Sequence, residues 1–283
     1  MRVVVAGAAG HLGAAIVDAF GSTHDVVALT RAGLDITDRR AVRDRLRVLA
    51  PDVVVNCAAY NDVDAAQRDP APALEVNAMA LAGLARAAAE ADATLVHFST
   101  DFVFDGTASR PYVETDPPRP MSFYGLTKLL GERLAMEAPR HYVLRVESIF
   151  GGPTAGTTAR DGSLGTIVRR LRAGDEVTVF VDRTVSPSYA PDVAAAVRAL
   201  VEGAAPAGLY HCVSDGHATW EAVAREAATI LGVQAKLEAV KLADVPLAAP
   251  RPAYCALDTA KLRSVGVVMR PWQDALRAWL KGA

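Results

Sequence analysis

Short valine-rich runs alternate with helix-forming runs through the first half of the chain, and this alternation limits the fold more than any other feature. The runs predicted as strands are almost continuously apolar, as expected for strands buried on both faces; they cover residues 2–8, 25–31, 52–59, 94–100 and 142–151. Helices are predicted between them, at about 11–20, 38–50, 71–91 and 122–137. Such alternation implies right-handed crossovers, and so predicts an α/β fold with a doubly wound parallel sheet.

Three glycines lie between the first predicted strand and the first predicted helix, in the segment GAAGHLG. Gly7, Gly10 and Gly13 permit a tight turn and let backbone N–H groups approach a pyrophosphate, whose charge the helix N-terminus stabilises. The spacing is G-x-x-G-x-x-G, but its place after the first strand predicts a dinucleotide site of Rossmann type. His11 and Leu12 lie in the same loop, where we expect His11 to face phosphate or solvent.

The end of the second predicted strand bears on the choice of cofactor. An acidic residue there would bind the ribose 2′-hydroxyl, whereas an arginine accommodates a 2′-phosphate. Arg31 occupies this place. The sequence therefore predicts NADPH, with NADH and a merely solvated Arg31 as the alternatives.

After about residue 150 the pattern changes, and a Gly/Thr-rich segment at 151–165 predicts a mobile loop. The remaining elements are predicted as a helix at 164–173, a strand at 176–182, a helix from Asp192, a strand at 208–214, and helices from Thr219 and Trp272. We expect residues 1–150 to form the NAD(P)-binding domain, to which parts of later segments return. Residues 151–283 should form mainly a smaller substrate-binding lobe.

Composition excludes several classes of protein. The chain has 283 residues, a net charge of −2, 51% hydrophobic and 22% charged residues, which fits a globular protein without the basic footprint of a nucleic-acid binder. No apolar run is long enough to span a bilayer, and the first strand begins too early to leave room for a signal peptide. Three distant cysteines and the absence of HxH or HExxH spacing predict neither a disulfide framework nor a metal site. We therefore expect a cytoplasmic protein.

Tyr124 and Lys128 lie four residues apart in SFYGLTKLLGE, on one face of a predicted helix. A tyrosine with a pKa of about 10 is a poor acid, and a nearby ammonium favours its phenolate. Such a pair suits protonation of an oxygen while hydride arrives at its carbon. Thr100 ends the fourth predicted strand, at the edge where a parallel sheet binds ligands. The alternatives are a surface tyrosine, a solvated lysine, and a threonine bonded to its own backbone.

Beyond these residues, seven segments resemble the extended short-chain dehydrogenases/reductases, and most of all the dTDP-4-dehydrorhamnose reductase family. The segments are GAAGHLG, PDVVVNCAAYNDVDAAQRDP, EVNA, STDFVFDG, ETDPPRPMSFYGLTKLLGE, GLYHCVSDGHATW and RPAYCALDTAKL. They run in the family's order from near residue 1 to near 280. The resemblance implies an NADPH-dependent reduction of a sugar ketone.

The resemblance also implies roles for individual residues. Thr100, Tyr124 and Lys128 match the catalytic residues: the tyrosine donates the proton, the lysine holds the ribose hydroxyls and lowers the tyrosine pKa, and the threonine hydrogen-bonds the carbonyl. The other matches are Asp35 and Ile36 beside the adenine, Ala58, Ala59 and Tyr60 along the cofactor, Asn77 supporting the lysine through water, and Arg251 near the substrate.

The residues after Thr100 separate two reactions of this superfamily. Nucleotide-sugar 4,6-dehydratases usually carry Asp-Glu there, because elimination needs an extra acid–base pair. Here the pair is Asp101 and Phe102, which we place at the substrate end of the site. A simple ketone reductase is therefore favoured over a dehydratase.

The substrate half departs from the family. Where the family reads Arg-Thr-Ser-Trp, this chain has Arg-Val-Glu-Ser at 145–148, so a stacking tryptophan is replaced by Ser148. Glu147 could bind a hydroxyl or amine of a different substrate, or be exposed and point away. An asparagine pair of the family is replaced at 162–163 by Gly-Ser. Arg183 could meet a substrate phosphate, since arginine suits bidentate contact.

Three functions follow as alternatives. The first is reduction of a 4-keto nucleotide sugar by NADPH, and the second is reduction of a non-nucleotide ketone or aldehyde. The third is a catalytically quiet, NADP-binding regulatory subunit, against which the retained Thr100, Tyr124 and Lys128 argue. Helices 71–91 and 122–137 are Ala- and Leu-rich on more than one side. In the superfamily that the chain resembles, such helices often pair into a four-helix bundle between subunits, so the resemblance implies a homodimer; ordinary packing on their own sheet is the alternative.

Overall fold

A computed structural model of the protein describes residues 1–152 and 162–282. The segment predicted as a mobile loop falls largely on residues 153–161, which lie outside the described residues.

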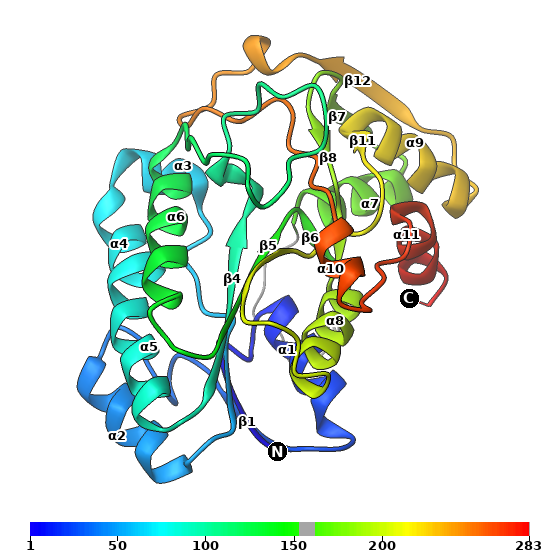
Figure 1. Ribbon diagram of the computed structural model, residues 1–283. Helices are drawn as coiled ribbons and strands as arrows, with labels where there is room; N and C mark the ends of the chain where they lie inside the picture. The colour runs from blue at the N-terminus through cyan, green and yellow to red at the C-terminus, as the bar shows by residue number, and fades with distance from the viewer. Residues whose placement is uncertain (153–161, 283) are drawn as a thin grey trace.

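A six-stranded parallel sheet forms the centre of the molecule (Figure 1). Its strands are β1 (Arg2–Ala6), β2 (Asp25–Leu29), β3 (Val53–Asn56), β4 (Thr94–Thr100), β5 (His141–Val146) and β10 (Gly208–His211). They pair in the order β10-β5-β4-β3-β1-β2. The chain leaves β1 for β2 on one side and then builds β3, β4 and β5 on the other. The strand order therefore reverses at β1, and the ligand crevice is expected at the carboxyl ends there.

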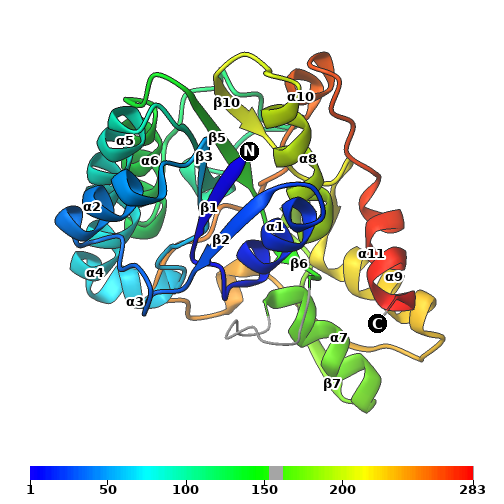
Figure 2. The same cartoon turned by 90° about the horizontal axis from the view of Figure 1, so that it is seen from below.

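Helices cover both faces of this sheet (Figures 1 and 2). Helices α2 (Arg39–Leu49), α5 (Ala80–Glu90) and α6 (Phe123–Ala135) lie on one face, and α1 (His11–Gly21) and α8 (Ala190–Glu202) lie on the other. The alternation of side chains along β1 explains the two layers: Val3 and Val5 enter the core beneath α1 and α8, whereas Val4 enters the core beneath α2 and α5. The predicted doubly wound α/β fold is confirmed.

The helix predicted at 71–91 contains an irregular turn. The run consists of α4 (Pro70–Leu74), a turn of π-helix, η1 (Glu75–Met79), and α5. Such turns are rare in proteins overall, but those that occur often lie at functional sites. A short helix that was not predicted, α3 (Val63–Arg68), precedes them, and the Asp62 side chain caps it by accepting a hydrogen bond from Ala65 N at 2.9 Å.

The second half of the chain builds a smaller lobe and also returns to the main sheet. The lobe contains α7 (Ser163–Ala173), β7 (Glu176–Phe180), α9 (Trp220–Leu231), β12 (Lys236–Val240) and α11 (Trp272–Lys281). These elements share a separate apolar core, and β12 pairs with β7 in parallel. In contrast, β10 pairs with β5 of the main sheet, and α8 packs in the same core as β1.

Short elements complete the structure: η2 (Asp101–Val103), β6 (Ile149–Phe150), β8 (Thr184–Val185), β9 (Ser188–Tyr189), β11 (Ala218–Thr219), η3 (Leu242–Asp244) and α10 (Ala260–Ser264). The strand predicted at 142–151 is thus divided. β5 ends at Val146, Ser148 adopts a φ of 44°, and β6 pairs with β9 outside the main sheet. The apolar run was read as one strand because its pattern shows no break at the left-handed residue.

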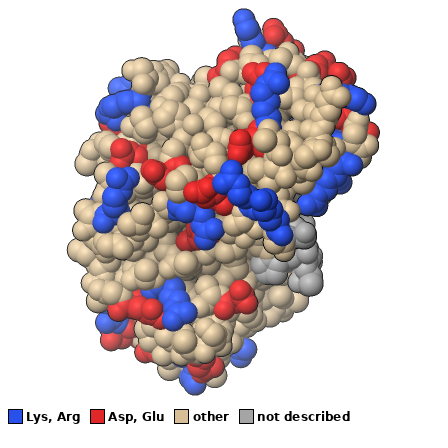
Figure 3. Space-filling model, turned by 90° about the vertical axis from the view of Figure 1, so that its right-hand side faces the viewer, with Lys and Arg blue, Asp and Glu red and all other residues tan. Residues whose placement is uncertain are grey.

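The surface bears interspersed charges, and neither sign covers the face seen in Figure 3. Among the described residues, we find no helix that combines the length and apolarity needed to cross a membrane.

Candidate active site

A cleft of about 870 Å³ opens at the carboxyl ends of the central strands. The ends of β1 to β5, the start of α1 and the start of α7 all contribute to its wall. The main sheet and the smaller lobe therefore enclose one continuous site.

The glycine loop forms one end of this cleft. Gly7 has a φ of 76°, and a Cβ there would lie 2.6 Å from Ala58 N. A Cβ on Gly13 would overlap the Gly7 carbonyl oxygen, whereas at Gly10 the nearest atom would be 3.5 Å away. Two of the three glycines are therefore required by the space available. His11 and Leu12, at the start of α1, also line the cleft, and their contact with the cofactor stays a prediction.

The end of β2 contributes a charged pair. Arg31 lines the cleft with a side chain that is 86% exposed, and its Nε lies 3.2 Å from Asp35 Oδ2. Asp35 also accepts hydrogen bonds from Thr37 N and Thr37 Oγ1, at 3.0 and 2.7 Å. These bonds lower the Asp35 pKa and hold the carboxylate beside Arg31. Ile36 follows as a buried apolar surface of the same wall.

Ala58, Ala59 and Tyr60, which we expect along the cofactor, line the cleft after β3. Asn77 holds this loop from the π-helical turn: its side chain accepts a hydrogen bond from Tyr60 N at 2.8 Å and donates one to Tyr60 O at 3.0 Å. It also donates to Thr127 Oγ1 at 3.2 Å.

Asn77 was assigned to the cofactor site because the resemblance gives it the task of supporting Lys128 through water. It is not among the described residues that form the wall, and its amide ties the loop after β3 to α6. The support of the lysine through water stays a prediction.

Thr100, Tyr124 and Lys128 converge on the cleft and all three are buried. Thr100 stands at the end of β4, and the other two lie one turn apart on α6, whose N-terminus Ser122 caps by accepting from Gly125 N at 3.2 Å. Lys128 Nζ donates a hydrogen bond of 2.6 Å to Phe98 O. Burial lowers the pKa of Lys128 to about 8, so the protonated, cationic form of this side chain predominates at neutral pH.

The Tyr124 hydroxyl has a pKa that is raised, not lowered. Burial disfavours the phenolate, the Asp101 carboxylate adds to this effect, and a hydrogen bond with Thr100 only partly offsets it. Burial and Asp101 thus set the direction of the net shift, and the lowering of the tyrosine pKa expected from Lys128 stays a prediction. The lysine is directed to a carbonyl of β4, and burial dominates.

Thr100 is held from two sides. Its hydroxyl donates to Asp101 Oδ1 at 2.8 Å and accepts from Phe102 N at 3.2 Å. Both readings of this residue thus describe it, since it faces the cleft and also bonds its own backbone. Phe102 meets Tyr124 edge to face, with ring centroids 5.5 Å apart.

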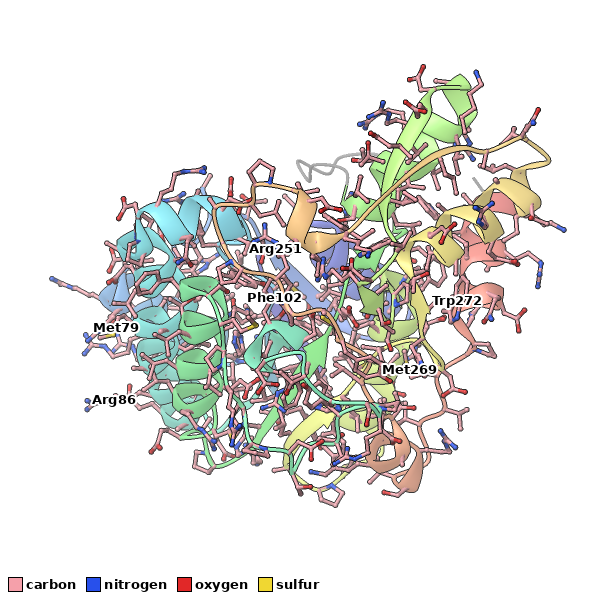
Figure 4. All side chains as sticks on the ribbon, turned by 90° about the horizontal axis from the view of Figure 1, so that it is seen from above. Met79, Arg86, Phe102, Arg251, Met269 and Trp272 are labelled. Carbon is pink, nitrogen blue, oxygen red and sulfur yellow. The ribbon has the colours of Figure 1, made fainter. Side chains whose placement is uncertain are left out.

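Two arginines surround the Phe102 ring. The guanidinium carbon of Arg183 lies 5.3 Å from the ring centroid and that of Arg251 lies 5.7 Å from it; Figure 4 shows Arg251 close to Phe102. Arg251 is anchored by Asp64 at 2.8 Å. Both arginines line the cleft, so the predicted substrate end is cationic and aromatic.

Glu147 lies where neither sequence interpretation placed it. It is 1% exposed, so it does not point into solvent, and it is not among the described residues that line the cleft. Its Oε2 accepts a hydrogen bond from Ser186 N at 2.6 Å. The predicted direct contact with substrate is therefore not seen, because the side chain turns inward behind Asp101 and Arg183.

Several wall residues were not predicted as site residues, among them Thr30, Val76 and Cys57. Ser148 and the Gly162–Ser163 pair also line the cleft. The sequence did point to Ser148 and to the Gly162–Ser163 pair, because the chain departs at these positions from the family it resembles. No pattern of the chain marked Thr30 or Val76, which reach the wall only through the packing of the fold.

This fold and this site together define an extended short-chain dehydrogenase/reductase. The chain belongs to the RmlD substrate binding domain family, whose sequence profile matches residues 1–283.

Individual relatives agree with this assignment. The dTDP-4-dehydrorhamnose reductase of Mycolicibacterium smegmatis is 39% identical, covering 98% of this chain and 84% of that protein. A probable dTDP-4,6-dihydroxy-2-methyloxan-3-one 4-ketoreductase of Streptomyces antibioticus is 36% identical, with coverages of 98% and 94%. The crystal structure of dTDP-4-dehydrorhamnose reductase from Bacillus anthracis in complex with NADP has a TM-score of 0.93 at 26% identity, covering 100% of this chain and 99% of that one.

Proposed function

We propose that the protein is an NADPH-dependent reductase of a 4-keto sugar carried on a nucleotide. One observation carries the proposal: Thr100, Tyr124 and Lys128 converge at one part of the cleft whose other end is the glycine loop. The relatives named above act on dTDP-linked sugars, which supports the substrate class. A non-nucleotide ketone remains the second candidate, because Ser148 stands where the family has a stacking tryptophan.

The cleft fits a dinucleotide by its own geometry. At Gly7 and Gly13 the backbone is packed too closely for a side chain, and the N-terminus of α1 offers unpaired N–H groups to a pyrophosphate. The exposed guanidinium of Arg31 suits a 2′-phosphate. The bound nicotinamide supplies hydride to the carbonyl carbon.

The chain's own residues manage the proton and the charge. Tyr124 is protonated at neutral pH, as a tyrosine ordinarily is, and is available as the proton donor to the carbonyl oxygen. The ammonium of Lys128 lies one helical turn away and stabilises the negative charge left on the tyrosine. Thr100 lines the same part of the cleft, with its hydroxyl held by Asp101 and Phe102 N.

The substrate end suits a diphosphate. Arg183 and Arg251 bring two positive charges to the Phe102 ring, and both line the cleft. Arginines are well adapted to phosphate oxygens. A sugar without its nucleotide would not use these contacts, so we expect it to react far more slowly.

The decisive assay compares substrates. Freshly made dTDP-4-dehydro-6-deoxyhexose would be offered with NADPH or NADH, with and without a 3,5-epimerase, beside the same ketosugar lacking its nucleotide. We expect NADPH oxidation with the nucleotide-linked sugar, and dependence on the epimerase would identify a rhamnose-type substrate. Equal rates with the free ketone would overturn the nucleotide-sugar assignment.

We also infer a homodimer formed through the outer face of α4 to α6. Phe123, Leu126 and Leu130 form an exposed apolar row on α6, with Leu126 51% exposed. Met79 and Leu74 of the neighbouring helical run are exposed too, and Figure 4 shows Met79 at the outer edge of this layer.

Light scattering of Leu126→Glu would test the dimer. The variant should be monomeric at concentrations where the wild type is dimeric. Val48→Glu, which changes another exposed apolar residue on α2, is the matched control and should leave the dimer intact. A monomeric wild type would end this inference.

The proposed setting is the cytoplasm. Cys57, Cys212 and Cys255 are free thiols, which suits a reducing compartment.

A further inference from the structure

Two buried carboxyl groups meet behind the substrate end of the cleft. Asp101 is 2% exposed and Glu147 is 1% exposed, and their carboxyl oxygens lie within 4.8 Å of one another and of Cys255 Sγ. Asp101 Oδ2 and Glu147 Oε1 have no hydrogen-bond partner among the described residues. Each carboxyl therefore keeps one buried oxygen without a donor from the described residues.

The positive charge available to this pair is limited. Arg183 Nη2 lies 3.8 Å from Asp101 Oδ2 and 4.0 Å from Cys255 Sγ. The other groups facing Glu147 are uncharged, namely the Ser186 N–H and the Cys255 thiol. Tyr124, which is also uncharged, is near enough to Asp101 for that carboxylate to raise its pKa. One guanidinium offsets one carboxylate, and a second buried carboxylate would remain unpaired, which is strongly unfavourable.

Two explanations can satisfy such a pair, a bound cation or a proton. A divalent cation between Asp101, Glu147 and Cys255 would lie about as close to the Arg183 guanidinium as these groups do, and the two positive charges would repel. A proton adds no such repulsion and supplies the missing donor between two oxygens that both lack one.

We propose that Glu147 is a neutral carboxylic acid that directs its proton toward Asp101 and so acts as a positioning residue for the reaction. The positioning role, though not the protonation of Glu147, rests on the proposed function. Asp101, held from behind by this proton, keeps its other oxygen for the Thr100 hydroxyl and keeps Arg183 beside Phe102. Burial and the neighbouring Asp101 raise the Glu147 pKa well above its usual range, in agreement with the geometry.

Infrared spectroscopy can observe the proton without any substrate. At neutral pH the wild type should show the C=O stretch of a buried protonated carboxyl, and Glu147→Gln should lack it. Glu137→Gln, which removes an exposed carboxylate on the turn after α6, should keep the band. Absence of the band from the wild type at neutral pH would refute the protonation of Glu147 even if the protein proves to be a reductase.

The pH dependence of stability gives a second measurement. A carboxyl whose folded pKa is raised binds a proton in the folded state that the unfolded chain has lost, so its stabilising effect is present below the unfolded pKa of about 4.3 and declines as pH rises above it. The melting temperature of wild type minus that of Glu147→Gln should therefore fall steadily from pH 5 to pH 9. A difference that stays constant or rises with pH would show an ionised glutamate.

Kinetics then test the positioning role. Glu147→Leu keeps the volume but removes the donor to Asp101, and should lower kcat at least tenfold while leaving the NADPH affinity within twofold. Glu147→Gln restores a donor and should recover most of the lost kcat, with an alkaline limb of the pH profile shifted relative to wild type. Equal kcat for wild type and Glu147→Leu would overturn the positioning role, whatever the infrared result.

Discussion

Gly13 is the residue at which α1 comes closest to the preceding loop. A Cβ at this position would overlap the Gly7 carbonyl oxygen, whereas a Cβ on Gly21, at the other end of the same helix, meets nothing within 4 Å. Gly13→Ala should lower the free energy of unfolding by roughly 1–3 kcal/mol, as overpacking does, and weaken NADPH binding more than tenfold. Gly21→Ala should be neutral or stabilise by up to about 1 kcal/mol. Denaturant unfolding and a cofactor titration check both, and similar effects at the two sites would contradict the close packing.

Lys128 is a residue that function retains at the expense of stability. Its ammonium is buried, which lowers its pKa from 10.5 to about 8. The unfolded chain binds this proton more tightly, so the destabilising effect is full below about pH 8 and fades as pH rises toward about 10.4. Lys128→Met should therefore abolish turnover yet raise the free energy of unfolding at pH 7 by on the order of 1–3 kcal/mol, after loss of the bond to Phe98 O.

Unfolding of wild type and Lys128→Met across pH 7 to 10.5 checks this sign. The advantage of the variant should shrink with rising pH. A variant that is less stable than wild type at pH 7 would show that the hydrogen bond to Phe98 O outweighs the cost of burial.

At the scale of elements, one ion pair fixes the helix that bears the catalytic pair. Glu132 on α6 and Arg145 on β5 form two bonds of 2.8 Å, and both side chains are almost fully buried. Breaking such a pair on one side leaves a buried charge without its partner and typically costs 3–5 kcal/mol. The pair therefore sets the distance of α6 from the sheet, and with it the place of Tyr124.

Glu132→Gln should lower the free energy of unfolding by about 3–5 kcal/mol. The matched control is Glu90→Gln on α5, which removes an exposed pair with Arg86 at 3.1 Å; Arg86 lies at the outer edge of the helical layer in Figure 4. This control should cost less than about 0.5 kcal/mol. Urea unfolding of both variants measures the two losses in the free energy of unfolding. Equal losses would mean that the buried pair contributes little to stability.

The sequence predicted those elements whose hydrophobic period is long and regular, namely the strands of the main sheet and helices such as α6 and α7. It could not predict the turn of π-helix at Asn77, because one inserted residue leaves the apolar pattern of the helix almost unchanged. The sequence analysis also joined β5 to β6, because a serine does not ordinarily adopt the positive φ that Ser148 has.

The glycine loop and the Tyr-Lys pair of the site were predicted because their chemistry depends on local spacing. The burial of Glu147 was not predicted, because it depends on Ser186 and Asp101, which are distant in sequence.

At the scale of the whole molecule, the main sheet needs the second half of the chain. β10 completes the edge beside β5, and α8 covers the face that α1 shares. A fragment of residues 1–150 would expose apolar residues of α1 and of β5, among them Ile16, Leu144 and Val146. We expect this fragment to lack a cooperative unfolding transition. Calorimetry of the fragment checks this, and a sharp transition together with NADPH binding would show that the first half folds by itself.

The central claim is that Tyr124 donates the proton in an NADPH-dependent ketone reduction. The most direct measurement is NADPH oxidation with a dTDP-4-keto sugar by wild type and by Tyr124→Phe, with cofactor affinity measured for both. The account predicts turnover by wild type and a loss of at least a hundredfold in kcat for Tyr124→Phe, at similar NADPH affinity. Comparable kcat in the two proteins, or tight NADPH binding by wild type without turnover of the nucleotide-linked or the free ketone, would contradict it.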